Sequence, residues 1–341
     1  MRALLLRSVA VSPASGAGGP ARFQRTGNLA YAGGRVYRGD NHNLPQPAGR
    51  RSVGAVDNRS DIRDFLATRR ARLTPEQVGL PAGGGRRRVP GLRREEVAVL
   101  AGVSPEWYSR LEKGHISGVS EDVLEAVARA LQLDQAERTY LFDLARAARP
   151  TTRTPRRRKQ AEVRPRVQWM LDSMTSSAAF VRNGRMDILA INALGRALYS
   201  PIYADDRRPA NIARYQFLDP TAADYFPDWD GAANVTVALL RAEAGRDPHN
   251  KELRELVGEL STLSEQFRAR WATHNVRIHH AGKKQFNHPE VGPLDLVYHS
   301  LDLAADDDWV LDLTIYTAEP GTSSEDRLKL LASWAATHIP A

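Results

Sequence analysis

The sequence contains no cysteine, which excludes disulfide bonds, thiolate metal ligands and cysteine nucleophiles. It also lacks any apolar run of about 18 residues, the length that a helix needs to span a bilayer. Near the N-terminus, Arg7 interrupts an apolar patch at residues 3–6, which is far shorter than the hydrophobic region of a secretory signal. These absences predict neither export nor membrane insertion, and we expect a cytoplasmic protein that does not bind a membrane.

Side-chain spacings typical of catalytic and metal sites are also missing. His279 and His280 are adjacent, so on a strand they would face opposite sides and could not bind one ion. His274, His288 and His299 are too far apart along the chain to form a metal-ligand motif. The sequence has no glycine-rich phosphate loop, serine nucleophile elbow or paired-carboxylate motif. It therefore predicts no enzyme, no metal and no cofactor, and an enzyme tethered to DNA is the least favoured interpretation.

Basic residues are concentrated in the first half of the chain. Residues 1–165 contain 30 Lys and Arg against 16 Asp and Glu, whereas residues 166–341 contain 18 against 24. A strongly basic half attracts a polyanion, while a slightly acidic half is typical of an ordinary globular domain. This distribution predicts that the N-terminal half binds nucleic acid.

Two segments lack the periodicity of folded structure and divide the chain. Residues 1–57, rich in Gly, Ala, Pro, Arg and Asn, are predicted to be a disordered tail, or else the true translation start lies downstream of them. Residues 151–165 place six basic side chains among prolines and are predicted to be a basic linker. We therefore expect one domain over residues 58–150 and a second over residues 166–338.

The first domain is predicted to be all-α, with five short helices. Each segment has apolar residues at helical spacing and is bounded by capping residues or by Gly and Pro. The segments are a helix from Ser60 or Asp61 to Leu73, helices over Leu92–Ala101 and Pro105–Lys113, a helix capped by Ser120 that reaches Leu131, and a helix over Asp134–Ala148.

The second and third of these helices have the spacing of a helix-turn-helix over residues 93–113. Ala98 is small where the two helices would cross, and Gly102 suits the left-handed conformation that ends the first helix. Val103 would fill the gap between the helices, Ser104 would cap the second helix, and Pro105 fits its first turn. The pattern predicts that the second helix lies in the major groove of DNA.

The exposed side of this second helix is predicted to face DNA, with Tyr108 and Leu111 on the buried side and Glu112 in a structural role. Arg110 is the candidate for a bidentate contact to guanine, while Glu106 would accept from a cytosine amino group and Trp107 would pack on sugar or a thymine methyl. Alternatively, Glu106 and Arg110 pair with each other at i and i+4. The predicted DNA contacts on this helix are Ser104, Pro105, Glu106, Trp107, Ser109, Arg110 and Lys113.

Five further arginines are predicted to contact DNA phosphates. Arg93 and Arg94 would lie at the N-terminus of the first motif helix, where a phosphate is favoured. Arg86, Arg87 and Arg88 lie in a glycine-hinged loop that could reach the DNA backbone or the minor groove. The alternative is that these side chains are simply solvated.

The second half is predicted to be an α+β domain with a mostly antiparallel five-stranded sheet. Alternating apolar residues predict strands over Ala178–Val181, Met186–Ile191, Val276–Lys283, Leu294–Leu303 and Trp309–Thr317. Helical patterns occur over Ala193–Tyr199, Ile212–Phe217, Ala233–Ala244, Lys251–Thr262, Ser264–Thr273 and Glu325–Trp334.

A ligand pocket is expected between this sheet and the helices inserted after its second strand. Arg214 is a candidate partner for a ligand carboxylate, or else it pairs with Asp219, and Asn192 or His274 could donate a hydrogen bond. The candidate aromatic contacts are Tyr215, Phe217, Tyr225, Trp229, Phe267 and Trp271. The alternative is that these aromatic side chains simply pack in the core.

The motif string Val89–Gly114, VPGLRREEVAVLAGVSPEWYSRLEKG, resembles the xenobiotic-response-element class of bacterial transcriptional regulators, and more narrowly its MmyB-type branch. The segments Arg185–Asn192, Asn211–Pro220 and His288–Gly292 are similar to the ligand-binding domain of that branch. The resemblance covers about residues 60–335, whereas residues 1–57 have no counterpart in it.

The resemblance implies a five-helix DNA-binding head joined to a PAS-like domain whose hydrophobic pocket holds a small, fatty-acid-like molecule. It also implies a homodimer on double-stranded DNA, whose recognition helices would meet half-sites roughly 34 Å apart. The leading hypothesis is a one-component transcriptional regulator. The alternative is a DNA-binding regulator whose second domain mediates protein interaction or dimerisation without a small molecule.

Overall fold

The computed structural model describes residues 58–81, 91–149, 163–276, 281–304 and 310–338. The predicted tail at residues 1–57, the arginine loop Arg86–Arg88 and nearly all of the predicted linker lie outside these ranges. Residues 58–149 form the part that we call the head, and residues 163–338 form the sheet domain.

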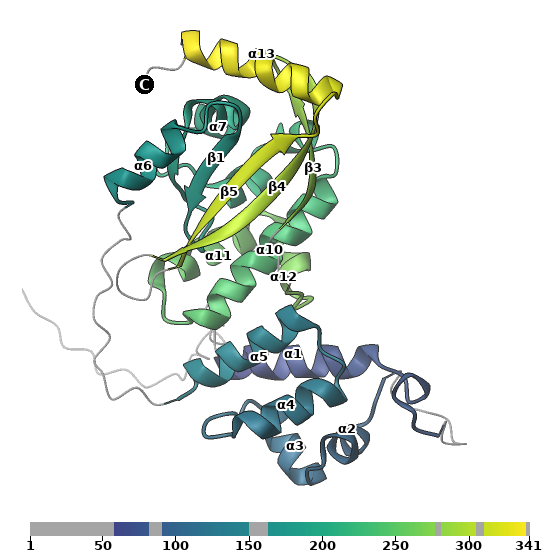
Figure 1. The fold of residues 1–341 in the computed structure, drawn as a ribbon. Coiled ribbons are helices and arrows are strands. Elements are labelled where there is room, and N and C mark those ends of the chain that lie inside the picture. The colour runs from purple at the N-terminus through teal and green to yellow at the C-terminus, as the bar shows by residue number, and fades with distance from the viewer. Residues whose placement is uncertain (1–57, 82–90, 150–162, 277–280, 305–309, 339–341) are drawn as a thin grey trace, which may run out of the picture. The chain divides into compact units, whose positions relative to one another are not determined.

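The head is all-α, as predicted. Its helices are α1 (Asn58–Arg72), α2 (Arg94–Ala101), α3 (Pro105–Glu112), α4 (Glu121–Ala130) and α5 (Gln135–Ala147), with a short 3₁₀ helix η1 (Glu76–Val78) after α1 (Figure 1). The expectation that Ser60 or Asp61 caps the first helix is wrong, because α1 already includes Asn58 and both residues lie inside it. Arg93, in extended conformation, precedes α2, which begins two residues later than predicted.

A single hydrophobic core holds the five helices together. Phe65 of α1 and Tyr140 of α5 pack edge to face with ring centroids 5.1 Å apart, and both are buried. Val97 of α2 and Val127 of α4 are fully buried in the same cluster. Burying an apolar side chain of this size stabilises the fold by about 1.5–3 kcal/mol, so the apolar faces seen in the sequence determine how the helices pack.

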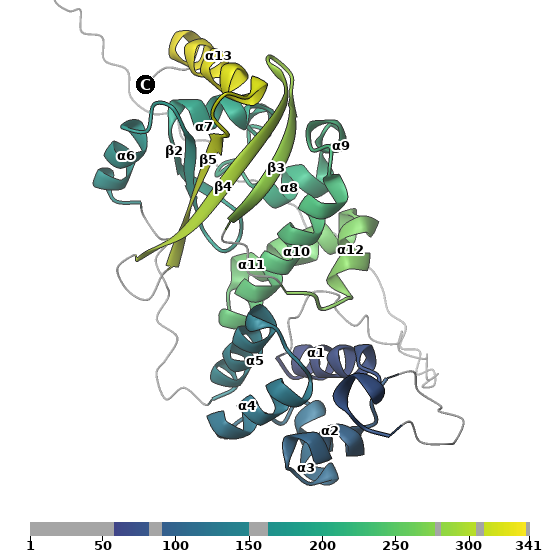
Figure 2. The ribbon, with the colours of Figure 1, turned by 45° about the vertical axis from the view of Figure 1, so that its right-hand side comes forward.

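The sheet domain contains an antiparallel five-stranded sheet of the predicted class. Its strands are β1 (Ala178–Arg182), β2 (Ile188–Ile191), β3 (Ala281–His288), β4 (Gly292–Ala304) and β5 (Val310–Ala318), in the order β2-β1-β5-β4-β3 (Figure 1 for β1, β5, β4 and β3; Figure 2 for β2). In the register of the sheet, Tyr298 of β4 lies opposite Tyr316 of β5, and Phe180 of β1 lies opposite Thr314. Aromatic and hydroxyl side chains of three strands therefore meet on one face.

The third strand begins later than predicted. The alternation from Val276 onward predicts a strand over residues 276–283, but β3 runs from Ala281 to His288. The tight reversal between His288 and Gly292 fixes the pairing of β3 with β4, and Gly292 adopts a positive φ of 76° there. Val276 is instead buried in the core of the head.

Helices cover both faces of the sheet. They are α6 (Pro165–Asp172), α7 (Ala193–Leu198), α8 (Ile212–Leu218), α9 (Ala222–Tyr225), α10 (Trp229–Arg246), α11 (Lys251–Leu263), α12 (Glu265–Trp271) and α13 (Ser323–His338), with a 3₁₀ helix η2 (Ser200–Ala204). The main core lies between one face and α7–α11 and α13, while α6, which the sequence did not predict, packs Leu171 against Val181 and Leu313 on the other face. Figure 2 shows α8, α9 and α10 beside β3.

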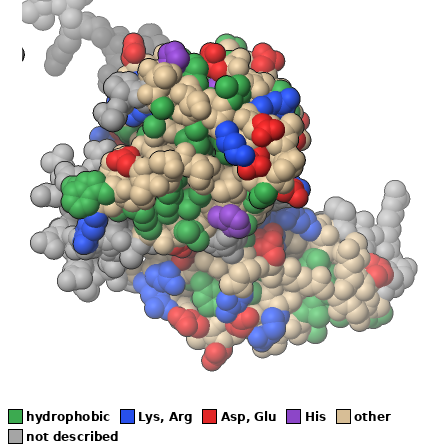
Figure 3. Space-filling view, turned by 45° about the horizontal axis from the view of Figure 1, so that its top comes forward, with side chains coloured by type: hydrophobic (Ala, Val, Ile, Leu, Met, Phe, Trp, Pro, Cys, Tyr) green, Lys and Arg blue, Asp and Glu red, His purple; other side chains and the backbone are tan. Residues whose placement is uncertain are grey.

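The described surface is mixed in character. Five large hydrophobic side chains are exposed, at Val99, Trp169, Leu263, Leu301 and Leu330. Figure 3 shows acidic, basic and hydrophobic side chains intermingled on the face turned to the viewer. Scattered exposed hydrophobic residues are common on protein surfaces and do not by themselves mark a binding site. None of the helices in the described ranges combines the length and apolar character that crossing a membrane requires.

Candidate DNA-binding helix and ligand cavity

The turn between α2 and α3 has the geometry that the sequence predicts. Gly102 adopts the left-handed conformation with φ 65°, and its N–H donates to the Val99 carbonyl at 3.2 Å. Ser104 caps α3, since its hydroxyl accepts from the Trp107 N–H at 3.1 Å, and Pro105 occupies the first helical position. The buried methyl group of Ala98 lets the two helices approach each other. These contacts fix the orientation of α3 relative to α2 within the head.

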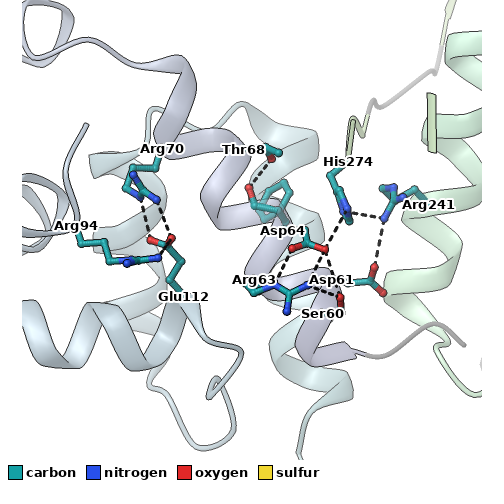
Figure 4. A network of polar contacts seen from close by, with 11 residues as sticks. Ser60, Asp61, Arg63, Asp64, Thr68, Arg70, Arg94, Glu112, Arg241 and His274 are labelled. Carbon is teal, nitrogen blue, oxygen red and sulfur yellow. Dashed lines mark hydrogen bonds and ion pairs between the residues drawn. The ribbon is translucent and has the colours of Figure 1, made fainter. Parts of the chain in front are cut away.

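Glu112 ties α3 to the rest of the head. Its carboxylate accepts two hydrogen bonds from Arg70 of α1, at 2.8 and 3.0 Å, and one from Arg94 of α2 at 3.0 Å (Figure 4). Burial disfavours its charge, but the hydrogen bonds from the two arginines outweigh burial and lower the pKa of the Glu112 carboxyl below its ordinary value. The predicted structural role of Glu112 is confirmed.

Five of the seven DNA contacts predicted on and beside α3 are exposed, whereas Trp107 and Ser109 are not. Ser104, Pro105, Glu106, Arg110 and Lys113 are exposed. Trp107 and Ser109 are half-buried, and the Trp107 ring packs partly against the head core.

Arg110 is available to a partner. Within the described ranges, the structure contains no ion pair or hydrogen bond between Arg110 and Glu106, so their alternative pairing does not form. A guanidinium on the exposed side of the second motif helix is suited to bidentate contact with a base edge.

Of the predicted phosphate contacts, two can be placed. Arg93 is exposed immediately before α2. Arg94 donates one hydrogen bond to Glu112, but its side chain remains 52% exposed and can still reach a phosphate. Arg86, Arg87 and Arg88 lie outside the described residues.

The sheet domain contains a cavity of about 450 Å³ between the inner face of the sheet and the first two-thirds of α10. Its walls include the aromatic rings of Phe180, Tyr199, Phe226, Tyr298 and Tyr316. Small-molecule sites in proteins span about 300–1,000 Å³ and are mostly apolar with a few polar groups. The size and lining of this cavity fit a small amphipathic molecule.

Lys284 of β3 places a positive charge among these rings. Its ammonium lies 4.3 Å from the centre of the Phe226 ring and 5.4 Å from that of Phe286, at cation–π distance. Among the described residues, no carboxylate pairs with it. Apolar surroundings lower the pKa of Lys284 to about 7, and the nearby charge of Arg182 adds to this effect.

Two further basic residues line the cavity, Lys283, whose side chain is exposed, and Arg182, whose charge is neutralised. Arg182 of β1 forms an ion pair with Asp312 of β5 at 2.9 Å. The Asp312 carboxylate also accepts hydrogen bonds from the hydroxyls of Ser300 and Thr314. Asp312 is therefore fully engaged. The carboxylates of Asp228 and Asp295 also line the cavity, but among the described residues neither forms an ion pair with Lys284.

The residues predicted from sequence to bind a ligand do not line this cavity. Arg214 and Tyr215 line a smaller one of about 70 Å³, room for about two water molecules. Arg214 pairs with Glu259 at 2.8 Å, and the structure shows no pairing with Asp219. These two residues therefore remain predicted rather than observed ligand contacts.

The other five predicted aromatic contacts pack in or against the main core of the sheet domain. Phe217 lies edge to face with Phe267 at 5.1 Å and with Trp229 at 5.8 Å. Phe267 stacks on Trp271 at 5.5 Å, and Tyr225 packs against Phe226 at 4.8 Å. These contacts match the core-packing alternative, because none of these five residues is in the lining of the cavity.

The predicted polar contacts are also engaged elsewhere. The Asn192 side chain accepts from the N–H groups of Ala179 and Gly195 and donates to two backbone carbonyls, which uses its whole hydrogen-bonding capacity. His274 lies beside Arg241 and helix α1. Sequence reasoning thus missed the cavity residues, although the alternation of Tyr298 with Ser300 and of Thr314 with Tyr316 indicates an inward face that carries polar groups.

Comparison with known protein families supports both halves of this description. Residues 61–141 match the family described as a helix-turn-helix domain. Residues 163–331 match the family described as the MmyB-like transcription regulator ligand binding domain. Among curated proteins, none matches the chain. Transcription regulators of this kind are not enzymes. The chain is thus a DNA-binding transcription regulator of the MmyB type, with a helix-turn-helix domain followed by a ligand-binding domain.

Proposed function

We propose that this protein is a one-component, cytoplasmic regulator whose affinity for a specific DNA sequence changes when a small acidic molecule occupies the 450 Å³ cavity. The observation that carries the proposal is the unpaired ammonium of Lys284 within aromatic walls. A charge in such surroundings is costly unless an opposite charge meets it. The ligand would therefore have an apolar body and one negatively charged group, as a fatty-acid-like molecule does.

The DNA-binding side of the proposal rests on the exposed face of α3. Arg110 would read a guanine, and Arg93, Arg94 and Lys113 would contact phosphates. The chain would act as a homodimer, so that two copies of α3 meet half-sites roughly 34 Å apart.

The ligand can change DNA affinity only if it binds one arrangement of the protein more tightly than another. A tenfold change in DNA affinity needs a difference of about 1.4 kcal/mol between the two arrangements. One ion pair formed with Lys284 inside the cavity has an energy of this order, since hydrogen bonds to charged groups contribute about 1.5–3 kcal/mol.

The test begins with protein purified from cells and denatured in organic solvent, whose extract is analysed by mass spectrometry. We expect an acidic amphipathic molecule from the unmodified protein and much less from Lys284→Met. Lys329→Met, at an exposed lysine of α13 outside the cavity lining, is the matched control and should retain the molecule. If no small molecule is recovered and added dodecanoate does not bind, the proposal is wrong and the alternative of a protein-interaction module is favoured.

A further inference from the structure

Helix α10 contacts both the ligand cavity and the head. Its first two-thirds contribute Gly231, Val235, Thr236 and Leu239 to the wall of the cavity. Its last third, from Arg241 onward, contacts the head. A helix rises 1.5 Å per residue, so Thr236 and Arg241 are only about 7–8 Å apart along one rigid rod.

Arg241 is the principal contact between this helix and the head. Its guanidinium lies 3.4 Å from the carboxylate of Asp61 in α1 and donates to Nδ1 of His274 at 2.9 Å (Figure 4). It also donates to the Trp271 carbonyl and stacks over the Trp271 ring at 4.0 Å. Although charged, Arg241 is only 1% exposed. Such a buried charge is tolerated because these partners surround it.

His274 extends the contact along α1. Its Nε2 lies 3.8 Å from the carboxylate of Asp64, and its carbonyl accepts a hydrogen bond from Arg69 at 2.7 Å. Its backbone adopts φ 52°, a conformation that residues other than glycine rarely adopt. Surrounding contacts must offset the cost of such a conformation, which indicates that the position of His274 is tightly specified.

Further along, α10 packs closely on α5. A Cβ atom at Gly245 would lie 2.3 Å from Cε2 of Tyr140, a buried residue in the core of the head. Glycine is therefore required for the two helices to come this close. Any movement of α10 would act directly on α5 and on α1, and α1 positions α3 through the contact of Arg70 with Glu112.

We infer that α10 carries the ligand signal to the DNA-binding head through the α10 junction, defined as Asp61, Asp64, Arg241 and His274. This inference rests on the proposed function and names its regulatory element. A ligand against Val235 and Leu239 displaces α10, and the displacement changes the contact between Arg241 and Asp61. The α10 junction then favours one of two orientations of the head. Coupling between distant sites requires an element with two such states, and the junction is that element.

The experiment compares the unmodified chain with Asp61→Asn, which keeps the shape of the side chain and removes its charge. Asp122→Asn, at an exposed position of α4 in the same head, is the matched control. For each protein, dodecanoate affinity is measured by calorimetry, and affinity for a selected operator is measured by fluorescence anisotropy with and without saturating dodecanoate. We expect Asp61→Asn to bind dodecanoate and operator within about threefold of the unmodified chain, but to lose the dodecanoate-dependent change in operator affinity.

Each outcome decides between the proposals. If Asp61→Asn responds to dodecanoate as fully as the control does, the inference is overturned while the proposed function stands. If the unmodified chain binds dodecanoate without any change in operator affinity, the proposed function fails and the inference fails with it.

A second measurement needs no variant and covers the case in which Asp61→Asn does not fold. Hydrogen exchange of the unmodified chain should show that dodecanoate changes the protection of amides in α1 and in the last third of α10 together. A change confined to the cavity strands and the first two-thirds of α10 would refute the inference.

Discussion

Arg70 and Glu112 join α1 to α3 through two hydrogen bonds, from Nη2 to Oε1 at 2.8 Å and from Nε to Oε2 at 3.0 Å. The carboxylate is buried, so this pair fixes the position of the recognition helix from inside the head.

Arg70→Ala would leave Glu112 with Arg94 alone, and we expect it to lower the free energy of unfolding by about 3 kcal/mol. Urea denaturation measures this difference. Arg94→Ala, which removes a largely exposed partner, should cost less than about 1 kcal/mol, and equal losses in the two variants would contradict this account.

Arg110→Ala tests whether α3 reads bases. We expect operator binding to weaken by about 1–3 kcal/mol and the preference at one base pair to relax, because a bidentate contact to one base is lost. Anisotropy titrations with operator variants and with random DNA measure both effects. Lys113→Ala is the comparison. Loss of a phosphate contact should weaken binding to all sequences and reduce the slope of log affinity against log salt concentration by about one. If Arg110→Ala weakens binding to random DNA as much as to operator, Arg110 contacts phosphate instead.

Lys284 should make the binding of acidic ligands depend on pH. The lowered pKa of about 7 means that the lysine of the empty cavity loses its charge as the pH rises through neutrality. Dodecanoate affinity should therefore fall between pH 6 and pH 8, and Lys284→Met should bind more weakly without this dependence. Calorimetry at several pH values gives both results, and an unchanged slope in the variant would contradict them.

The same lysine should oppose the stability of the empty protein. In the unfolded chain its pKa lies near 10.5, so between pH 7 and that value the unfolded state binds more protons than the folded state. The free energy of unfolding should rise with pH across this window by more in the unmodified chain than in Lys284→Met. At pH 7 the variant should melt at a higher temperature, and a lower melting temperature would show that Lys284 stabilises the fold.

His274 should make the protein less stable in acid. Burial and the charge of Arg241 lower its pKa to about 4, against 6.5 when it is unfolded, and Arg69 and Arg63 act in the same direction while Asp64 opposes them. The unfolded state therefore binds more protons below pH 6.5, so stability is complete above that pH and decreases as the pH falls toward 4. The slope contributed by one such group approaches about 1.4 kcal/mol per pH unit. Urea denaturation at pH 7 and pH 5 should show a larger loss for the unmodified chain than for His274→Gln, and equal losses would refute this assignment.

The helix-turn-helix could be predicted from sequence because its determinants are local. Gly102, Ser104 and Pro105 act within one turn of the residues that they influence, so their spacing alone indicates the motif. The start of β3 could not be predicted in the same way, since its register depends on the reversal at Gly292 and not on the alternation that begins at Val276.

The residues that line the cavity could not be predicted from local sequence patterns. Its lining comes from β1, β3, β4, β5 and α10, which are brought together only by the fold. Composition favours the aromatic residues of α8, α9 and α12 as candidates, but Phe217, Tyr225 and Phe267 do not line the cavity. Likewise, the contact of Arg241 with Asp61 joins residues 180 positions apart, and no local pattern predicts it.

The burial of Val276 in the head core means that the two domains cannot be separated by one cut of the chain. A head excised after residue 149 would lose Val276 and the His274 carbonyl that accepts from the buried guanidinium of Arg69. Modular exchange, in which the head of one regulator is fused to the ligand-binding domain of another, would therefore succeed only if the segment around residues 271–276 comes from the same parent as α1.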